Sequence, residues 1–302
     1  MKSTIIDTIR NTLPDVSVTE PEPMKAHCSF RTGGPAAAFL VPEDEGSMLK
    51  LLAVLSENEI PFIVLGNGTN VVFRDESLPY CIISTEKLQE ISLTEEGYVS
   101  AQAGAALSRV ATFAYENSLT GMEFASGIPG SAGGGVLMNA GAYGGELKDI
   151  ILSVRCCGKN GKYIQELPAE QCDFRYRHSL FQSGDYVILG AVFRLERGEK
   201  SGIAAKMKEL NARRREKQPL DLPSAGSAFK RPEGHYAAAL IEQCGLKGTA
   251  VGGAQVSEKH AGFIVNTGTA TSADLEALLT LVSDTVKERT GIELQREIIL
   301  FP

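Results

Sequence analysis

The chain has 302 residues, of which 43% are hydrophobic and 22% charged, so it carries enough apolar material to bury a core. This composition excludes disordered, collagen-like and coiled-coil proteins. Lysine and arginine number 30 against 37 acidic residues, which gives a net charge of −7, whereas nucleic-acid-binding domains usually carry a positive surface. We therefore expect a globular protein that acts on small molecules and has no nucleic-acid partner.

Neither the cysteines nor the apolar segments indicate secretion or a membrane. The six cysteines form no C-x-x-C pair, and Cys156 and Cys157 are adjacent, which favours reduced thiols in a cytoplasmic protein. No segment approaches the roughly 20 consecutive apolar residues of a membrane span. The N-terminal segment predicts a short amphipathic helix with Ile6 and Ile9 on its apolar face, and not a signal peptide.

Hydrophobic periodicity and capping residues predict the following elements in chain order. After the N-terminal helix, helices are expected at residues 44–58, 108–117, 203–217, 236–244 and 272–290, with Asp44 and either Thr271 or Ser272 as N-caps and Gly291 as a stop. Strands are expected at 36–41, 61–65, 81–84, 98–103, 151–156, 162–166, 186–196 and 292–301. The continuous apolar strand at 61–65 is expected to be buried on both faces. This order predicts an α+β body, with a substrate domain that begins near residue 200.

Two glycine-rich loops follow predicted strands, at 66–70 and 127–145, and the second has eight glycines in nineteen residues. Because glycine permits positive φ and carries no side chain, consecutive N–H groups can turn toward one anion. Taken alone, 66–70 is slightly more typical of an ordinary strand-ending turn than of a ligand site. A flexible linker at 127–145 is disfavoured by the apolar residues Val136, Leu137 and Met138 within it. Together the loops predict a large phosphate-bearing cofactor, which they do not name.

Several common sites are excluded by inspection. The sequence has no P-loop, no G-x-G-x-x-G opening a helix, no G-x-S-x-G nucleophile elbow and no H-E-x-x-H metal helix. The four histidines are far apart, so no metal site is expected.

Three polar residues beyond position 170 stand in informative surroundings. Arg177 lies in an alternation of charged and aromatic residues, Ser227 in a run of small residues, and Glu297 directly before an apolar strand. Desolvation of a carboxyl group in such a setting raises its pKa and lets it act as an acid. Taken singly, these residues are more typical of a surface cation, a turn serine and a strand-edge carboxylate.

Six motifs in this order resemble one family, the UDP-N-acetylenolpyruvoylglucosamine reductases. The motifs are R-T-G-G at 31–34, L-G-N-G-T-N at 65–70, G-I-P-G-S-A-G-G-G-V-x-M-N-A-G-A-Y-G at 127–144, Y-R-H-S at 176–179, A-G-S-A-F-K at 225–230 and E-I-I-L-F at 297–301. Each motif alone is weak evidence, whereas the combination extends over nearly the whole chain.

The resemblance implies an α+β fold with a two-subdomain FAD-binding module of the vanillyl-alcohol-oxidase (PCMH) type and a third α+β domain for the substrate. The expected boundaries are 1–85, 86–200 and 201–302, with the C-terminal strand returning toward the FAD module. FAD is expected to be bound non-covalently, with its pyrophosphate on the 66–70 loop. The cofactor-binding residues that the resemblance implies are Arg31, Thr32, Gly66, Asn67, Gly68, Thr69, Asn70, Gly127, Ile128, Pro129, Gly130, Ser131, Gly133, Gly134, Asn139, Gly141, Ala142 and Tyr143.

The implied enzyme is a flavoprotein UDP-N-acetylmuramate dehydrogenase, an oxidoreductase of peptidoglycan synthesis. NADPH first reduces the flavin, and the enolpyruvyl sugar nucleotide is then reduced at C3 and protonated at C2. The resemblance makes Ser227 the proton donor and assigns stabilisation of the developing charge to Arg177 and Glu297. The implied substrate-binding residues are Tyr176, Lys217, Lys230 and Arg231. A cytoplasmic monomer serving cell-wall biogenesis, cell shape and cell division is expected.

The chain resembles the shorter branch of the family, because residues 195–217 leave room for one helix and not for an inserted tyrosine-bearing loop. Arg231 also stands where the longer branch carries asparagine. One alternative is an oxidase of sugars or lactones with the same FAD module, although such enzymes often tether FAD through histidine and neither glycine-rich loop contains one. The other is a non-enzymatic nucleotide-binding protein.

Overall fold

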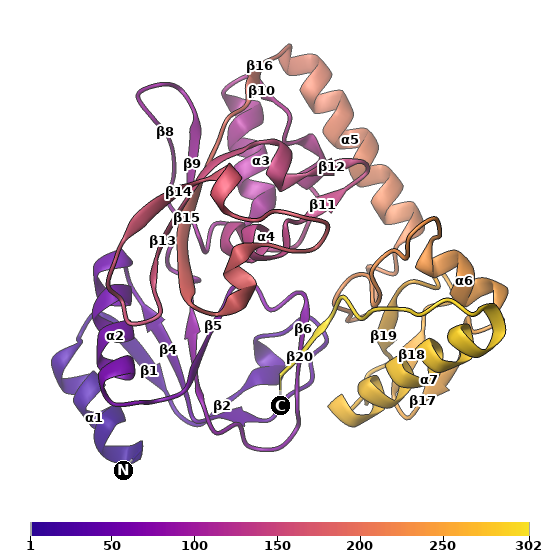
Figure 1. Ribbon diagram of the computed structural model, residues 1–302, viewed down its shortest axis with the longest axis horizontal. Helices are drawn as coiled ribbons and strands as arrows, with labels where there is room; N and C mark the ends of the chain where they lie inside the picture. Colours follow the sequence, from indigo (N-terminus) through magenta and orange to yellow (C-terminus); the bar gives the residue numbers. More distant parts are fainter. Residues whose placement is uncertain (1, 302) are drawn as a thin grey trace. The chain divides into compact units, whose positions relative to one another are not determined.

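The computed structural model describes residues 2–301, with side-chain environments from residue 6 onward (Figure 1). The chain forms two compact units, and each unit consists of three separate stretches of sequence. The first comprises residues 1–21, 37–67 and 79–212, and the second comprises 22–36, 68–78 and 213–302. The chain passes from the first unit to the second for the last time within helix α5 (Lys200–Lys217).

The first unit contains a four-stranded sheet in the order β1 (Val16–Thr19), β4 (Ala38–Pro42), β7 (Cys81–Ser84) and β5 (Phe62–Leu65). β4 and β5 each run parallel to β7. Helices α1 (Lys2–Thr12) and α2 (Glu45–Glu57) bury their apolar faces against this sheet (Figure 1). Asp44 is the N-cap of α2, as predicted, and its carboxylate accepts a 2.7 Å hydrogen bond from Ser47 N.

The expectation for the strand at 61–65 was wrong in one respect. β5 is at the edge of the sheet, and its residues Phe62, Ile63 and Val64 are only half-buried. A wholly apolar run therefore marks an edge strand here, since burial depends on neighbours that the local pattern does not reveal.

The first unit also contains a five-stranded antiparallel sheet. Its order is β14 (Gln165–Pro168), β13 (Ile151–Gly158), β15 (Tyr186–Phe193), β9 (Val99–Gln102) and β8 (Ile91–Leu93). Helices α3 (Leu107–Glu116) and α4 (Ala132–Met138) share its hydrophobic core. β14 begins three residues later than the predicted strand 162–166, and β15 ends before the predicted residue 196.

Short pairings complete the first unit. β10 (Leu119–Thr120) pairs with β16 (Glu196–Arg197), and β11 (Gly141–Ala142) with β12 (Gly145–Glu146). The second of these is a hairpin at the end of the second glycine-rich segment, close to the C-terminus of α4 in sequence.

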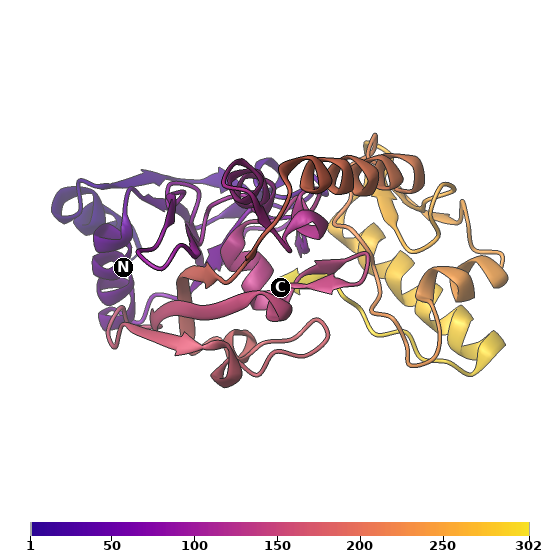
Figure 2. The ribbon, with the colours of Figure 1, turned by 90° about the horizontal axis from the view of Figure 1, so that it is seen from above.

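In the second unit, the sheet β17 (Ala250–Val251), β18 (Ala254–Val256) and β19 (Ile264–Asn266) lies beside α7 (Ser272–Thr290), drawn in yellow in Figure 2. α7 has Thr271 as its N-cap and ends at Gly291 in the left-handed conformation, as predicted. α6 (Ala237–Gln243) also packs on α7, and β2 (Glu22–Pro23) pairs with β3 (Pro35–Ala36).

The predicted strand 292–301 is much shorter in the structure. Only β20 (Ile299–Phe301) is formed, and it pairs in parallel with β6 (Val71–Phe73). The rings of Phe73 and Phe301 stack at 5.3 Å, which joins the two strands side by side within the second unit. None of the described helices is long and apolar enough to cross a bilayer. All six cysteines are buried, and none of them is in a disulfide within the described residues.

Candidate functional site

The two glycine-rich segments meet in the first unit, although they are about sixty residues apart in sequence. A Cβ atom on Gly66 would overlap Ser131 Oγ, so the missing side chain at Gly66 makes room for the Ser131 hydroxyl. Beside this contact, Asn67 Nδ2 donates a 3.3 Å hydrogen bond to the carbonyl of Pro129. The fold therefore joins the two segments into one surface.

The prediction that the second segment is a loop was wrong in part, because Ala132–Met138 within it forms helix α4. Ser131 caps α4 by accepting a 3.2 Å hydrogen bond from Gly134 N. A Cβ atom on Gly133 would lie 2.9 Å from the Ala103 Cβ, and one on Gly135 would lie 2.9 Å from two leucine methyl groups. These two glycines thus allow close helix packing, which explains part of the glycine content without a ligand.

Several main-chain N–H groups near the contact of the two glycine-rich segments have no hydrogen-bond acceptor among the described residues. The N–H groups of Asn67, Gly130 and Ser131 donate to no acceptor among the described residues of the first unit. The loop continues through Gly68, Thr69 and Asn70, whose N–H groups likewise have no acceptor in the described chain. Gly68 has φ +60°, and a Cβ there would overlap the carbonyl of His27. N–H groups without an acceptor on backbone of this kind suit an anionic ligand.

The R-T-G-G segment in the second unit contains an unsatisfied hydroxyl. Thr32 is only 2% exposed, and its Oγ1 has no hydrogen-bond partner. Leaving such a group unpaired costs about 1–3 kcal/mol, which a bound hydrogen-bonding group would offset. The neighbouring Phe30 carbonyl is fixed by a 2.8 Å hydrogen bond from Asn266 Nδ2, so this short segment is held in place.

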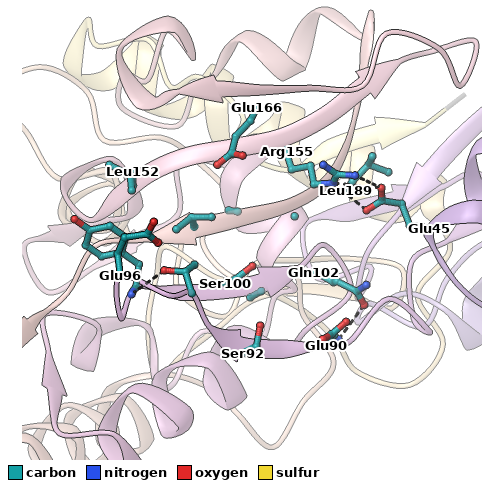
Figure 3. A pocket seen from close by; sticks show the side chains of 16 residues that line it. Glu45, Glu90, Ser92, Glu96, Ser100, Gln102, Leu152, Arg155, Glu166 and Leu189 are labelled. Atoms are coloured by element: carbon teal, nitrogen blue, oxygen red, sulfur yellow. Dashed lines mark hydrogen bonds and ion pairs between the residues drawn. The ribbon is translucent and has the colours of Figure 1, made fainter.

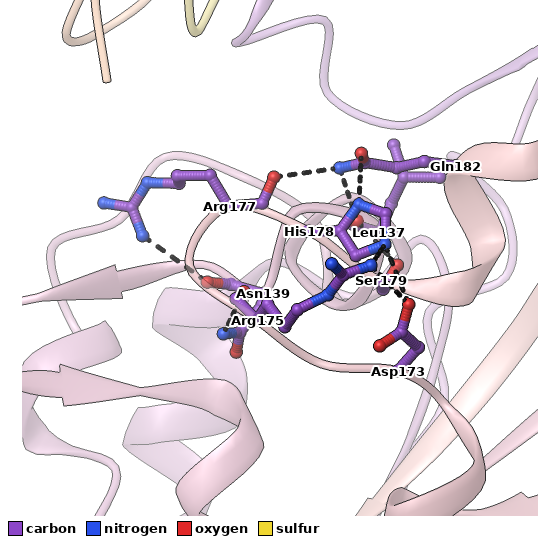
Figure 4. Close-up of polar contacts among 8 residues, drawn as sticks. All are labelled: Leu137, Asn139, Asp173, Arg175, Arg177, His178, Ser179 and Gln182. Carbon is purple, nitrogen blue, oxygen red and sulfur yellow. Dashed lines mark hydrogen bonds and ion pairs between the residues drawn. The ribbon is translucent and has the colours of Figure 1, made fainter. Parts of the chain in front are cut away.

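Arg177 lies against the end of the second glycine-rich segment (Figure 4). Its Nη1 and Nη2 donate hydrogen bonds of 3.4 and 3.0 Å to the carbonyls of Asn139 and Gly141. Its guanidinium carbon lies 5.0 Å from the centre of the Tyr176 ring. The structure therefore brings Arg177 and Tyr176 together with the motif that the sequence assigned to the cofactor.

Ser227 and Glu297 belong to two segments that run side by side in the second unit. Ser227 is exposed, between the buried residues Ala225 and Ala228. Glu297 N donates a 2.9 Å hydrogen bond to the carbonyl of Ala228, and the next bridge pairs Phe229 with Arg296. The A-G-S-A-F-K and E-I-I-L-F motifs are thus neighbours in space.

The remaining predicted substrate residues occupy the second unit without a described contact to Ser227. Lys217 is the exposed last residue of α5, and Lys230 is half-buried, with its N–H bonded to the carbonyl of Gln295. Arg231 is exposed, and its guanidinium lies 4.6 Å from the ring centre of Tyr236. Sequence reasoning missed Tyr236, because a lone tyrosine next to a short helix has no distinctive pattern.

A cavity of about 650 Å³ lies on the five-stranded sheet, but none of the predicted site residues lines it (Figure 3). It is bordered by Glu45, Glu90, Glu96 and Glu166, and Arg155 there is paired with Glu45 at 2.6 Å. So many carboxylates would repel a phosphate-bearing ligand. This cavity therefore does not suit the predicted phosphate-bearing cofactor.

Comparison with known proteins first shows the class of cofactor-binding protein to which the chain belongs. A family model described as an FAD binding domain matches residues 36–165. The structure of alkyldihydroxyacetonephosphate synthase shares the fold, with a TM-score of 0.50 at 12% identity, over 65% of this chain and 40% of its own. The chain is thus a flavoprotein with the expected type of FAD-binding fold.

The family follows from closer relatives. The model of the UDP-N-acetylenolpyruvoylglucosamine reductase C-terminal domain matches residues 218–301. UDP-N-acetylenolpyruvoylglucosamine reductase from Caldanaerobacter subterraneus is 45% identical, covering 99% of this chain and 98% of its own, and the Clostridium novyi enzyme is 46% identical, covering 91% and 89%. The crystal structure of the Thermus caldophilus reductase has a TM-score of 0.81 at 31% identity, over 95% of this chain and 99% of that one.

The chain belongs to the UDP-N-acetylenolpyruvoylglucosamine reductase family. This membership confirms the predicted family, the FAD-binding module and the assignment to the FAD-dependent oxidoreductases. The roles of individual residues stay predictions.

Proposed function

We propose that this protein reduces UDP-N-acetylglucosamine enolpyruvate to UDP-N-acetylmuramate, with NADPH as the reductant and non-covalent FAD as the cofactor. The observation that carries the proposal is the contact of Gly66 with Ser131, which brings the two glycine-rich segments together. Main-chain N–H groups in both segments have no acceptor among the described residues. The chain is also 45% identical to a UDP-N-acetylenolpyruvoylglucosamine reductase. FAD, when bound, would supply the transfer of two electrons and a proton, as a hydride, from NADPH to the substrate.

The residues present fit this cofactor. The N–H groups of Asn67, Gly68, Thr69 and Asn70 would hold the pyrophosphate, because they have no acceptor within the described chain. The unpaired Oγ1 of Thr32 is a second group that a bound cofactor would satisfy. We also propose the division of the chain at residues 85 and 200 into two FAD-binding subdomains and a substrate domain.

The substrate gains a hydride at C3 and a proton at C2, so the site must stabilise negative charge on the carboxylate next to C2 and then supply the proton. Arg177 would stabilise that charge, because its guanidinium is a fixed planar cation held by two carbonyls. Ser227 would donate the proton, since its side chain is exposed in a segment that is anchored by the buried residues Ala225 and Ala228. Glu297, in its protonated form, would assist by donating a hydrogen bond to the same carboxylate.

Recognition of the nucleotide diphosphate would fall to Lys217, Lys230 and Arg231, with Tyr176 beside Arg177. In this branch without the tyrosine loop, the 4.6 Å stack of Arg231 on Tyr236 offers a cation beside an exposed ring. We further propose that the protein acts as a monomer in the cytoplasm, where it would supply cell-wall synthesis and thereby support cell shape and division.

An anaerobic absorption spectrum tests cofactor, reductant and substrate together. We expect the purified protein to show FAD absorption, NADPH to bleach it, and the enolpyruvyl sugar nucleotide to restore it. FAD should leave the protein on denaturation, because no covalent tether is expected. A colourless protein that does not take up added FAD would refute the proposal, and recovery with free sugars alone would favour the oxidase alternative.

A further inference from the structure

Asn139, in the second glycine-rich segment, is hydrogen-bonded to the loop that contains Arg175 and Arg177. It is the C-cap of α4 in the left-handed conformation, with φ 42° and ψ 59°, and it is 0% exposed. Asparagine tolerates this backbone better than most residues, so both its backbone and its side chain are suited to the position.

The side-chain amide of Asn139 is engaged inside the protein. Nδ2 donates hydrogen bonds of 2.9 Å to the carbonyl of Arg175 and 3.1 Å to Glu146 Oε2, and Oδ1 accepts a 2.9 Å bond from Lys148 N. Both N–H bonds of the amide are therefore used, and a buried amide in this state has no donor left for a cofactor. Its side chain serves the protein around it.

Further contacts fix the same loop (Figure 4). The buried Ser179 donates a 2.7 Å hydrogen bond to the carbonyl of Leu137, one residue before the end of α4. Gln182 Nε2 donates to the carbonyls of Leu137 and Arg177 at 3.1 and 3.2 Å. Arg177 has φ 53°, an unfavourable value for arginine that persists only where the surroundings determine the backbone.

We propose that Asn139 is a positioning residue that fixes Arg177 relative to the cofactor-binding segment, rather than a side-chain ligand of FAD. The guanidinium of Arg177 rests on the carbonyl of Asn139, while the Asn139 amide holds the carbonyl two residues before Arg177. A displacement of this loop would move the cation away from the developing carboxylate charge. The inference rests on the proposed function for its catalytic part and on the contacts above for its structural part.

The test compares Asn139→Gly, which keeps the left-handed backbone and removes the amide, with Asn139→Asp, which keeps the acceptor for Lys148 N and removes the donors. Both should retain FAD and be reduced by NADPH within about twofold of the wild-type rate. Reduction of the sugar nucleotide should slow by about tenfold or more, the effect of about one lost buried hydrogen bond. Hydrogen exchange at residues 175–179 should accelerate in both variants.

Asn117→Gly is the matched control, because Asn117 caps α3 and its amide bonds only the carbonyl of Phe113 in its own helix. It should leave both half-reactions and the exchange at 175–179 unchanged. Gln182→Ala removes exposed contacts to the same loop and should give a weaker version of the Asn139 effect, even if the Asn139 variants fold poorly.

Unchanged exchange at 175–179 and unchanged sugar-nucleotide reduction in the Asn139 variants would overturn the inference. Loss of FAD, or an equal fall in both half-reactions, would also overturn it, since Asn139 would then serve the cofactor or the whole fold. If the wild-type protein did not reduce the sugar nucleotide at all, the proposed function would fail, and the exchange data would still decide whether Asn139 holds the loop.

Discussion

The side-chain amide of Asn70 donates a 3.1 Å hydrogen bond to the main-chain carbonyl of Glu297. The carbonyl of Asn70 in turn accepts a 3.0 Å bond from Ile299 N. Two hydrogen bonds thus connect Asn70 of the first glycine-rich loop to the segment of Glu297, the predicted catalytic carboxylate. Both Asn70 and Glu297 belong to the second unit.

This contact gives a prediction for Asn70→Ala. The Glu297 carbonyl would lose its donor, so we expect the free energy of unfolding to fall by about 1–2 kcal/mol. FAD affinity should change less, because the main-chain N–H of residue 70 remains. Urea unfolding and FAD titration by fluorescence measure the two effects, with Asn58→Ala, at an exposed helix end, as control. A lost FAD site with unchanged stability would make the amide a cofactor ligand.

The approach of the two glycine-rich segments predicts that Gly66→Ala abolishes FAD binding in a folded protein, because the new Cβ would overlap Ser131 Oγ. Adding Ser131→Ala should restore binding in part, since the nearest remaining atom, the Cβ of residue 131, lies 3.3 Å away. FAD content after gel filtration and circular dichroism measure these outcomes.

Gly184→Ala is the control for a glycine change as such. Gly184 has φ +80° and open space around its Cβ position, so the variant should lose about 1 kcal/mol of stability and keep FAD. If Gly66→Ala bound FAD as tightly as this control, the junction of the segments would not be the cofactor site.

Ser227→Ala separates the two half-reactions. We expect NADPH to reduce the flavin at the wild-type rate, because no proton donor to carbon is needed there, and sugar-nucleotide reduction to fall by at least about 10²-fold. Stopped-flow absorbance follows both steps, and Ser224→Ala in the same run of small residues is the control. An equal loss in both steps would disprove the role of proton donor.

Acid stability should depend on Asp274. Hydrogen bonds from the N–H groups of Thr271 and Gly253 lower the pKa of its carboxyl group. A carboxyl with a lowered pKa in the folded state contributes stability above its ordinary pKa of about 4, and this contribution is lost as the pH falls through the lowered value. The thermal midpoint should therefore fall more steeply on acidification in the wild type than in Asp274→Asn. Equal slopes would argue against this linkage.

Local signals predicted the elements that carry their own caps. Asp44 with Ser47, and Thr271 with Gly291, define helices whose ends depend on contacts within a few residues. α4 escaped prediction because its glycines have low helix propensity, and packing of Gly133 on Ala103 compensates for it. The edge position of β5 and the short β20 depend on partners distant in sequence, which no local pattern contains.

The candidate site was predictable as a set of motifs and not as an arrangement. Glycine content indicated a phosphate ligand, and the order of six motifs identified the family. The contact of Gly66 with Ser131 and the pairing of Ala228 with Glu297 arise from long-range topology. The motif assigned Asn139 to the cofactor and could not reveal that both N–H groups of its buried amide donate to protein acceptors.

The pairing of β6 with β20 has a consequence for biosynthesis. Residues 71–73 leave the ribosome early, but the strand that covers them is made more than two hundred residues later. A nascent chain can form the four-stranded and five-stranded sheets of the first unit before β20, the partner strand of β6, has been synthesised. The pairing of β6 with β20 can therefore form only after residue 301 has emerged, so this part of the second unit is completed last.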